Sequence, residues 1–435
     1  MAKLLIRGGR VIDPANRRDG RFDVLVERGK IVDLQPALAI IKGGPGPSIA
    51  PNGATVIEAS GKLIIPGLVD LHTHLRQPGR EDKETIETGV RAAVRGGFTA
   101  VCAMPNTEPP MDHRGVVDFL HQEARRLAIA SVWPVGAITR GRAGRELTDF
   151  GELFDAGCVA LSDDGSPVVD SLLMRRALEY AKVFDRPLIQ HAEDPSLAAG
   201  GVMHEGLVST TLGLRGMPAE AESVMVARDL ALAELTGGWI HFAHLSAERS
   251  VELVRQAKRR GVHVTCEATP HHLALTHEAV GAFDARAKVN PPLRTDRDRL
   301  ALIEGLRDGT IDCIATDHAP HTDWEKDADF DSAPFGISGL ETALGVCVEA
   351  LVIPGHLTWP QLVEKLAVNP ARIAGIAGGA LSVGADADVV LVDPQAQWTV
   401  EPDRFASKAR HSPFAGRRLT GVVERIWYRG QAVVG

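Results

Sequence analysis

The sequence predicts an α/β protein, a (β/α)8 barrel of the TIM type with a small β-sandwich domain built from both chain termini. Two observations predict this fold class. The middle of the chain alternates nearly continuous apolar runs with helical stretches, as parallel strands covered on both faces require. The two ends instead carry short alternating runs broken by Gly, Asn and Asp turns, which are typical of antiparallel strands.

The barrel is expected over residues 67–380, where eight strand-like runs follow one another. These runs are LIIPGLVDLHTH, FTAVCAMPNT, SVWPVGAIT, CVALSDDG, RPLIQHAED, WIHFAHLS, HVTCEATPHHL and IDCIATDHAPH. Helical stretches such as ETIETGVRAAVRGG lie between them. Residues 1–66 and 381–435 flank the barrel, and we expect them to pair into the small β domain.

Composition excludes several classes of protein. The chain has 435 residues, 44% of them hydrophobic, which is ample for a large core. A formal net charge of −8 argues against binding to nucleic acid. The apolar runs are too short for a membrane span, and the N-terminus does not resemble a secretory signal. The five Cys form no C-x-x-C motif, so we expect buried thiols in a cytoplasmic protein.

Polar residues stand where the strands end, which is where barrels of this kind carry their chemistry. These residues are His72, His74, Asn106, Asp163, Asp164, His191, His244, Glu267, His271, His272, Asp317 and His318. Two His one residue apart on a strand share a face and can bind one metal ion. One such pair is also common among ordinary surface or core-edge histidines, but convergence from most of the strands favours a metal centre.

Imidazole and carboxylate ligands suit Zn²⁺, with Mn²⁺, Co²⁺ or Fe²⁺ as alternatives. One catalytic zinc needs about three protein ligands. Four His and two Asp therefore suggest two metals that share a bridging group.

At these residues the chain resembles the amidohydrolase superfamily, and more narrowly the bacterial type I dihydroorotases. The resemblance covers essentially the whole chain. It rests on DLHTHLRQPG, MPNT, SDDGSPV, QHAED, FAHLS, ATPHH, KVNPPLR, ATDHAPH and APFGISGLET. H-x-H alone marks only the superfamily, whereas the Arg that follows it, together with NPPLR, TDHAPH and APFG, is similar to dihydroorotases.

The resemblance implies the metal ligands. The first metal is expected on His72, His74 and Asp317, and the second on His191 and His244. Many relatives bridge the two with a carboxylated Lys, but residues 157–168 contain none. Asp164 resembles the residue that bridges the two metals. Asp163 and Asp164 point to opposite faces of the strand, so only one of them can enter the site, and the other would have a turn or capping role.

The resemblance also implies the substrate site. Its residues are His74, Arg76, Asn106, Asn290, His321, Phe335 and Gly336. Arg76, Asn106 and His321 would hold a free carboxylate, for which guanidinium is a natural partner. Asn290 could instead be a pre-proline turn residue, and Phe335 could simply pack in the core.

The sequence departs from the family motif at two positions and adds one polar segment. Thr73 replaces an aliphatic residue and should point away from the metal. Gln77 replaces Glu and removes a charge near Arg76. Residues 322–334 are polar and are expected to form a flexible loop beside or over the pocket.

The implied reaction is the reversible cyclisation of N-carbamoyl-L-aspartate to L-dihydroorotate and water, a step of pyrimidine biosynthesis. In hydrolysis a metal-bound hydroxide would attack the ring amide, and Asp317 would move the proton to the leaving nitrogen. His271, His272 and His318 could support the site or be structural. No nucleic-acid or membrane partner is expected. A homodimer and a complex with aspartate transcarbamoylase are family-level expectations.

Two other functions remain open at this stage. The chain could be another cyclic amidohydrolase, such as a hydantoinase or allantoinase, although such substrates do not need the carboxylate clamp. It could also be an inactive scaffold partner of aspartate transcarbamoylase, although a scaffold would be expected to lose metal ligands.

Overall fold

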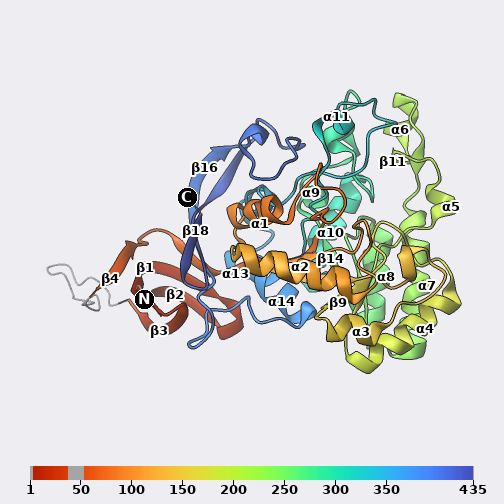
Figure 1. The fold of residues 1–435 in the computed structure, drawn as a ribbon. Coiled ribbons are helices and arrows are strands. Elements are labelled where there is room, and N and C mark those ends of the chain that lie inside the picture. Colours follow the sequence, from red (N-terminus) through yellow and green to blue (C-terminus); the bar gives the residue numbers. More distant parts are fainter. Residues whose placement is uncertain (1–2, 38–52, 435) are drawn as a thin grey trace.

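The computed structural model describes residues 3–37 and 53–434. Two large sheets organise this part of the chain (Figure 1). One is a parallel barrel sheet formed by the middle of the chain, and the other joins strands from its two ends. The predicted fold class is confirmed.

The barrel sheet runs in sequence order, with every neighbouring pair parallel. Its strands are β6 (Leu68–Thr73), β7 (Phe98–Ala103), β8 (Ser131–Gly136), β9 (Ala160–Ser162), β10 (Leu188–Gln190), β13 (Ile240–Phe242), β14 (Val264–Ala268) and β15 (Cys313–Ile314). A parallel bridge between Thr73 and His318 brings the first strand back to the last. The carboxyl ends of all eight strands therefore meet at one rim.

Helices surround this sheet (Figure 1). The longer ones are α1 (Ile86–Arg95), α2 (Arg114–Leu127), α4 (Ser171–Ala181), α7 (Glu220–Thr236), α8 (Glu248–Arg259) and α10 (Asp296–Asp308). Shorter ones are α3 (Phe150–Asp155), α5 (Pro195–Ala198), α6 (Leu207–Leu212), α9 (Pro270–Ala274), α11 (Asp323–Lys326), α12 (Ala343–Cys347), α13 (Trp359–Val363) and α14 (Asn369–Ala374). Side-chain caps begin several of them, as at Thr85, Asp170 and Thr295, and satisfy amide groups that the first turn leaves free.

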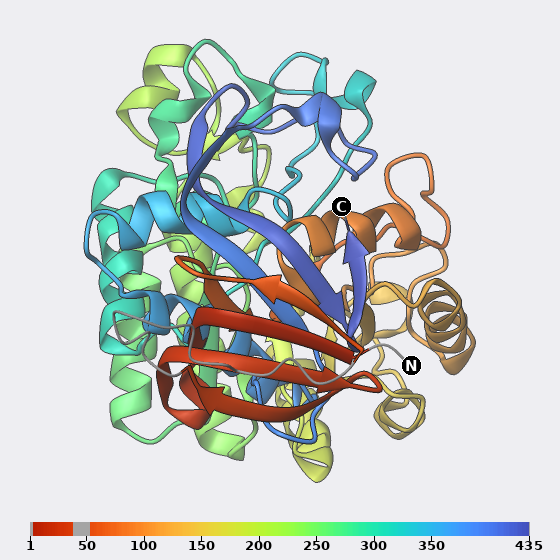
Figure 2. The same ribbon diagram turned by 90° about the vertical axis from the view of Figure 1, so that its left-hand side faces the viewer.

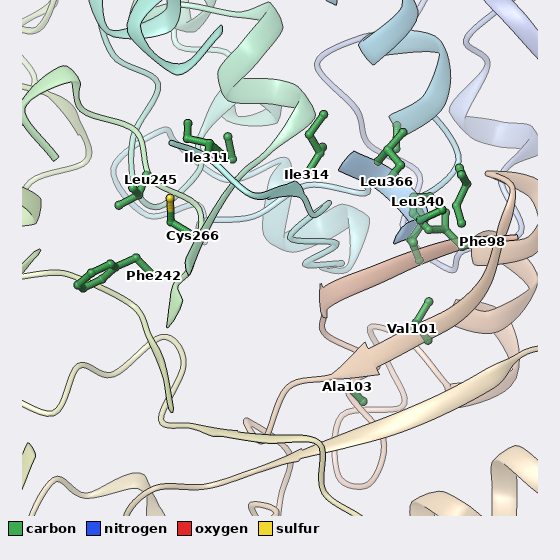
Figure 3. Close-up of a cluster of buried hydrophobic side chains, with 14 of the residues drawn as sticks. Phe98, Val101, Ala103, Phe242, Leu245, Cys266, Ile311, Ile314, Leu340 and Leu366 are labelled. Atoms are coloured by element: carbon green, nitrogen blue, oxygen red, sulfur yellow. The ribbon is translucent and has the colours of Figure 1, made fainter. Parts of the chain in front are cut away.

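The barrel core consists of apolar side chains from strands and helices. Figure 3 shows Phe98, Val101 and Ala103 from β7 with Phe242, Cys266 and Ile314 from the later strands. β6 and β7 are buried along their whole length, including the polar residues Asp70 and His72 of β6. All five cysteines are free and buried, as expected.

The second sheet joins the two ends of the chain (Figure 2). Its order is β18-β17-β16-β5-β1-β2-β3, with β4 added to β1. The strands are β1 (Lys3–Asp13), β2 (Arg18–Glu27), β3 (Lys30–Pro36), β4 (Ala54–Glu58), β5 (Leu63–Pro66), β16 (Val389–Thr399), β17 (Arg418–Tyr428) and β18 (Gln431–Val434). β5 and β16 pair antiparallel, from Leu63 with Val392 to Pro66 with Val389. A third, two-stranded sheet, β11 (Met203–His204) with β12 (Gly216–Met217), stands apart from both.

The small β domain has its own core and also shares the core of the barrel. Ile6, Val24, Ile31, Val389 and Trp427 belong to the first. Side chains from β5, β16 and β17 belong to the cluster that fills the barrel, namely Leu63, Ile65, Val390, Val392 and Ile426. The domain limits at residues 66/67 and 380/381 stay a proposal. Within the described residues, no helix is long and apolar enough to span a membrane.

Candidate metal centre

Side chains from the ends of β6, β9, β10, β13 and β15 converge at the rim of the barrel. His72 and His74 share a face, and their Nε2 atoms lie 3.6 Å and 3.1 Å from Asp317 Oδ1. Thr73, between them, points the other way and donates its hydroxyl hydrogen to the Cys102 carbonyl (2.8 Å). The structure thus brings together the three residues expected on the first metal.

Asp164 lies at the centre of the cluster. Its Oδ1 is 3.3 Å from His72 Nε2, 3.7 Å from His244 Nε2 and 3.9 Å from His191 Nδ1. Its Oδ2 is 3.5 Å from His74 Nε2. One carboxylate therefore faces four imidazoles, three of them through Oδ1 and one through Oδ2.

The neighbouring carboxylate has a different surrounding. Asp163 accepts hydrogen bonds from the Thr139 amide (2.9 Å) and from the Thr139 hydroxyl. It ties the loop after β8 to the end of β9. The structure therefore places Asp164, and not Asp163, among the histidines.

The chemistry of this donor set fits metal ions. His72 donates from Nδ1 to Glu267 Oε1 (2.8 Å), and His74 donates from Nδ1 to Asn106 Oδ1 (2.8 Å). With the ring proton on Nδ1, each ring would turn the lone pair of its Nε2 atom toward a bound cation. His72 Nε2 and Asp164 Oδ1 are buried and have no hydrogen-bond partner. A cation between these atoms would satisfy them.

Among the described residues, three sets of possible ligand atoms lie close enough together to share an ion. Two belong to this cluster, namely His72 with Asp164 and His244, and His72 with His74 and Asp317; the third is His241 with Glu267 and Cys313. Burial alone would raise the pKa of Asp164, but the adjacent imidazoles, His72 foremost, hold that pKa well below its ordinary value. The carboxylates are therefore ionised at neutral pH, as ligands must be.

Three residues of the site have a strained backbone. Arg76, His244 and Asp317 have positive φ angles of 61°, 30° and 48°. Such conformations cost about 1–3 kcal/mol each in a non-glycine residue, and they persist where the surrounding structure fixes them. Each lies two or three residues after the end of a barrel strand, namely β6, β13 or β15.

Glu267, at the end of β14, accepts hydrogen bonds from several groups of the site. Besides His72, it accepts a hydrogen bond from His241 Nε2 (3.2 Å) and one from the His244 amide (3.3 Å). It is fully buried, and burial would raise its pKa, but the bonds from His241 and His72 lower that pKa to about 2. Its place at a strand end was visible in the sequence, whereas these partners were not.

The three remaining rim histidines have different surroundings. His318 Nε2 lies 3.2 Å from Glu84 Oε2, and its Nδ1 accepts from the Gly339 amide. His272 donates to the Pro291 carbonyl (2.9 Å). His271 Nε2 is buried without a partner, and burial lowers the pKa of this ring to about 4, so it is neutral.

The residues expected to hold a carboxylate lie beside the cluster. Arg76 donates from Nε to the Pro320 carbonyl (3.1 Å), and its Nη2 lies 3.5 Å from His321 Nε2. Asn106 uses its Oδ1 for His74. Gln77, the departure from the motif, accepts a hydrogen bond from the Ile86 amide (3.0 Å) and thus anchors the start of α1.

Two of the other predicted substrate residues line one pocket. Asn290 and Phe335 lie on its wall together with Glu193, Lys288 and Arg215. Asn290 Nδ2 donates to Glu193 Oε2 (2.8 Å), while its Oδ1 is buried without a partner. Gly336 has a φ of +127°, and a Cβ there would lie 2.6 Å from the Ala319 carbonyl oxygen. Only glycine fits this position.

Comparisons with known proteins identify the family of the chain. A family model described as dihydro-orotase-like matches residues 61–250. The chain is 53% identical to the dihydroorotase of Pelotomaculum thermopropionicum, covering 97% of this chain and 96% of that protein. It is 50% identical to the dihydroorotase of Acetivibrio thermocellus, covering 99% of both.

Solved structures show the same fold at lower identity. The L-hydantoinase (dihydropyrimidinase) of Arthrobacter aurescens has a TM-score of 0.86 and 25% identity, covering 100% of this chain and 96% of that one. The dihydropyrimidinase of Brevibacillus agri NCHU1002 has a TM-score of 0.83 and 23% identity, covering 99% and 95%. The much higher identity to dihydroorotases favours that function over a hydantoinase.

Proposed function

The chain belongs to the dihydroorotase family and is a cyclic amide hydrolase, and from this premise we propose how its own residues interconvert N-carbamoyl-L-aspartate and L-dihydroorotate. The observation that carries the proposal is the position of Arg76. Arg76 follows His74 by two residues, and the cluster carboxylates Asp317 and Asp164 are close enough to its guanidinium to favour the charged form. A substrate that has a ring amide and a carboxylate would place the amide at the cluster and the carboxylate against Arg76.

We propose that His72, His74 and Asp317 hold one zinc ion, that His191 and His244 hold a second, and that Asp164 bridges them. Zinc accepts imidazole and carboxylate ligands in catalytic sites. Bound metal lowers the pKa of a coordinated water to about 7 and polarises the amide carbonyl. Glu267 fixes the His72 ring so that Nε2 faces the ion.

Asp317 is proposed as the general acid and base. In hydrolysis it takes a proton from the attacking water and delivers it to the ring nitrogen as the C–N bond breaks. Burial opposes its ionisation, but the hydrogen bond with His74 and the charges of the other imidazoles keep its pKa below the ordinary value. It therefore begins this cycle as a carboxylate that can accept the proton.

Arg76 and Asn106 are proposed to bind the substrate carboxylate, with His321 beside them. A guanidinium binds a carboxylate through two parallel N–H donors. Burial lowers the pKa of Arg76 to about 10, so it stays charged at neutral pH. Asn290, Phe335 and Gly336 are proposed to contact the pyrimidine ring.

Replacement of Arg76 tests the proposal. We expect Arg76→Ala to raise KM for dihydroorotate and to lower kcat/KM about 100-fold, because a charge-assisted pair is lost. Arg91→Ala is the control, since Arg91 pairs with Glu87 on the exposed face of α1. Unchanged kinetics in Arg76→Ala, with intact metal content, would contradict the carboxylate clamp and favour a neutral cyclic amide as substrate.

The family also leads us to propose a homodimer located in the cytoplasm that could dock to aspartate transcarbamoylase. Sedimentation of the purified chain, alone and mixed with that enzyme, tests both associations.

A further inference from the structure

Lys83 lies in the loop between β6 and α1 and is buried, with a side-chain exposure of 9%. Its ammonium is 3.1 Å from His321 Nδ1 and 2.8 Å from Glu325 Oε1. The next residue, Glu84, binds Ser407 and His318, so the backbone that carries Lys83 is anchored on two sides. No motif singled Lys83 out in the sequence.

The contact with Lys83 fixes the proton on His321. A lysine ammonium has only donors, so His321 Nδ1 is the acceptor and the ring proton is on Nε2. That N–H donates to the Phe335 carbonyl, 2.8 Å away. Burial and the nearby cations, Arg76 and Lys83 among them, hold the pKa of His321 well below its ordinary value. The ring is therefore neutral, with one defined tautomer.

This tautomer matters for Arg76. The Arg76 Nη2 atom lies 3.5 Å from His321 Nε2, and both atoms carry hydrogen. His321 thus accepts nothing from the guanidinium. If the ring proton moved to Nδ1, the Nε2 lone pair would accept from Arg76 and compete with a substrate carboxylate. The Phe335 carbonyl would lose its donor at the same time.

The ion pair with Glu325 weakens the electrostatic effect of Lys83 on Arg76. Glu325 Oε1 lies 2.8 Å from the ammonium, so the two opposite charges partly cancel at a distance. The His321 ring is in direct contact, and it links Lys83 to both Arg76 and Phe335.

We propose that Lys83 is a positioning residue for substrate binding, which holds His321 in the Nε2–H tautomer and so keeps the Arg76 donors available for the substrate carboxylate. The inference rests on the proposed function, since it takes Arg76 as the carboxylate ligand. Lys83 would thus affect the affinity for the substrate carboxylate without contacting that carboxylate.

The test is a double-mutant cycle on the metal-loaded enzyme. Lys83→Met should raise KM for dihydroorotate and the inhibition constant of orotate by a common factor of about ten, with kcat within about twofold. In a His321→Asn background, the same change should alter KM less than about twofold, because Lys83 acts through the ring. Lys83→Arg, which keeps a donor, should recover part of the loss.

Lys258→Met is the matched control, because Lys258 forms a comparable ion pair with Asp312 (2.7 Å) away from the site. Equal losses from Lys83→Met in both backgrounds would overturn the inference, as would an effect confined to kcat or no effect. A wild-type enzyme that is loaded with metal but does not hydrolyse dihydroorotate would instead overturn the proposed function.

Discussion

At the residue scale, the adjacent carboxylates of Asp163 and Asp164 have different partners. Asp164 faces four imidazoles, whereas Asp163 holds Thr139. We expect Asp164→Asn to lose metal and to lower kcat/KM about 100-fold or more, because metal-dependent stabilisation of several kcal/mol is lost. Asp163→Asn should keep its metal and lower the free energy of unfolding by about 1–2 kcal/mol. Elemental analysis, kinetics and thermal denaturation of both variants check this, and equal metal loss in both would contradict it.

Residue types at strand ends made the cluster predictable from the sequence. The period of two along a strand places His72 and His74 on one face, and it separates Asp163 from Asp164. Partners that lie far apart in the chain were not predictable in this way. Glu267 meets His72 across the barrel, and Lys83 meets His321 over 238 residues of sequence, so no local pattern marks either contact.

At the element scale, the segment after β15 differs from its expectation. Residues 322–334 look polar and flexible in sequence, and the structure places Ala333 and Pro334 on the pocket wall. The segment is nevertheless anchored, because Lys326 is buried and donates to the Pro334 and Gly336 carbonyls (2.9 Å each). Phe330 is buried as well. The charged residues of this segment suggest exposure, and nothing in the sequence marks Lys326 as a buried side chain.

We expect the backbone next to this anchored segment to require glycine at position 336. Gly336→Ala should raise KM for dihydroorotate about tenfold and lower the melting temperature, because its Cβ would meet the Ala319 carbonyl and shift the backbone beside Phe335. Gly355→Ala is the control, since Gly355 also has a positive φ (+80°) but has open space around it. Each variant loses about 1 kcal/mol to the left-handed conformation, and only Gly336→Ala should change KM. The same KM in both would contradict the account.

At the scale of the whole molecule, the small β domain supports the rim of the barrel. A segment between β16 and β17 reaches over it, where the Ser407 hydroxyl and the Lys408 amide bind Glu84 and the Arg410 amide binds Asp323. The division into barrel and terminal strands was predictable from hydrophobic periodicity. This long-range support was not, because the segment has no periodic pattern and its contacts are polar.

The shared core predicts that the two parts unfold together. Leu63, Ile65, Val390, Val392 and Ile426 of the terminal strands pack in the barrel cluster, so separation would expose apolar surface on both sides. Calorimetry should show one transition, which shifts to lower temperature when metal is removed, because metal binds the folded state. Two well-separated transitions would contradict a common core.

The most direct test of the central claim measures dihydroorotate hydrolysis by the purified chain after chelation and again as zinc is restored. The account predicts that activity disappears on chelation and returns in full at two zinc ions per chain, since Asp164 faces all four histidines proposed as ligands of the two ions. A folded protein that hydrolyses no dihydroorotate in either state, or one that is fully active without metal, would contradict it.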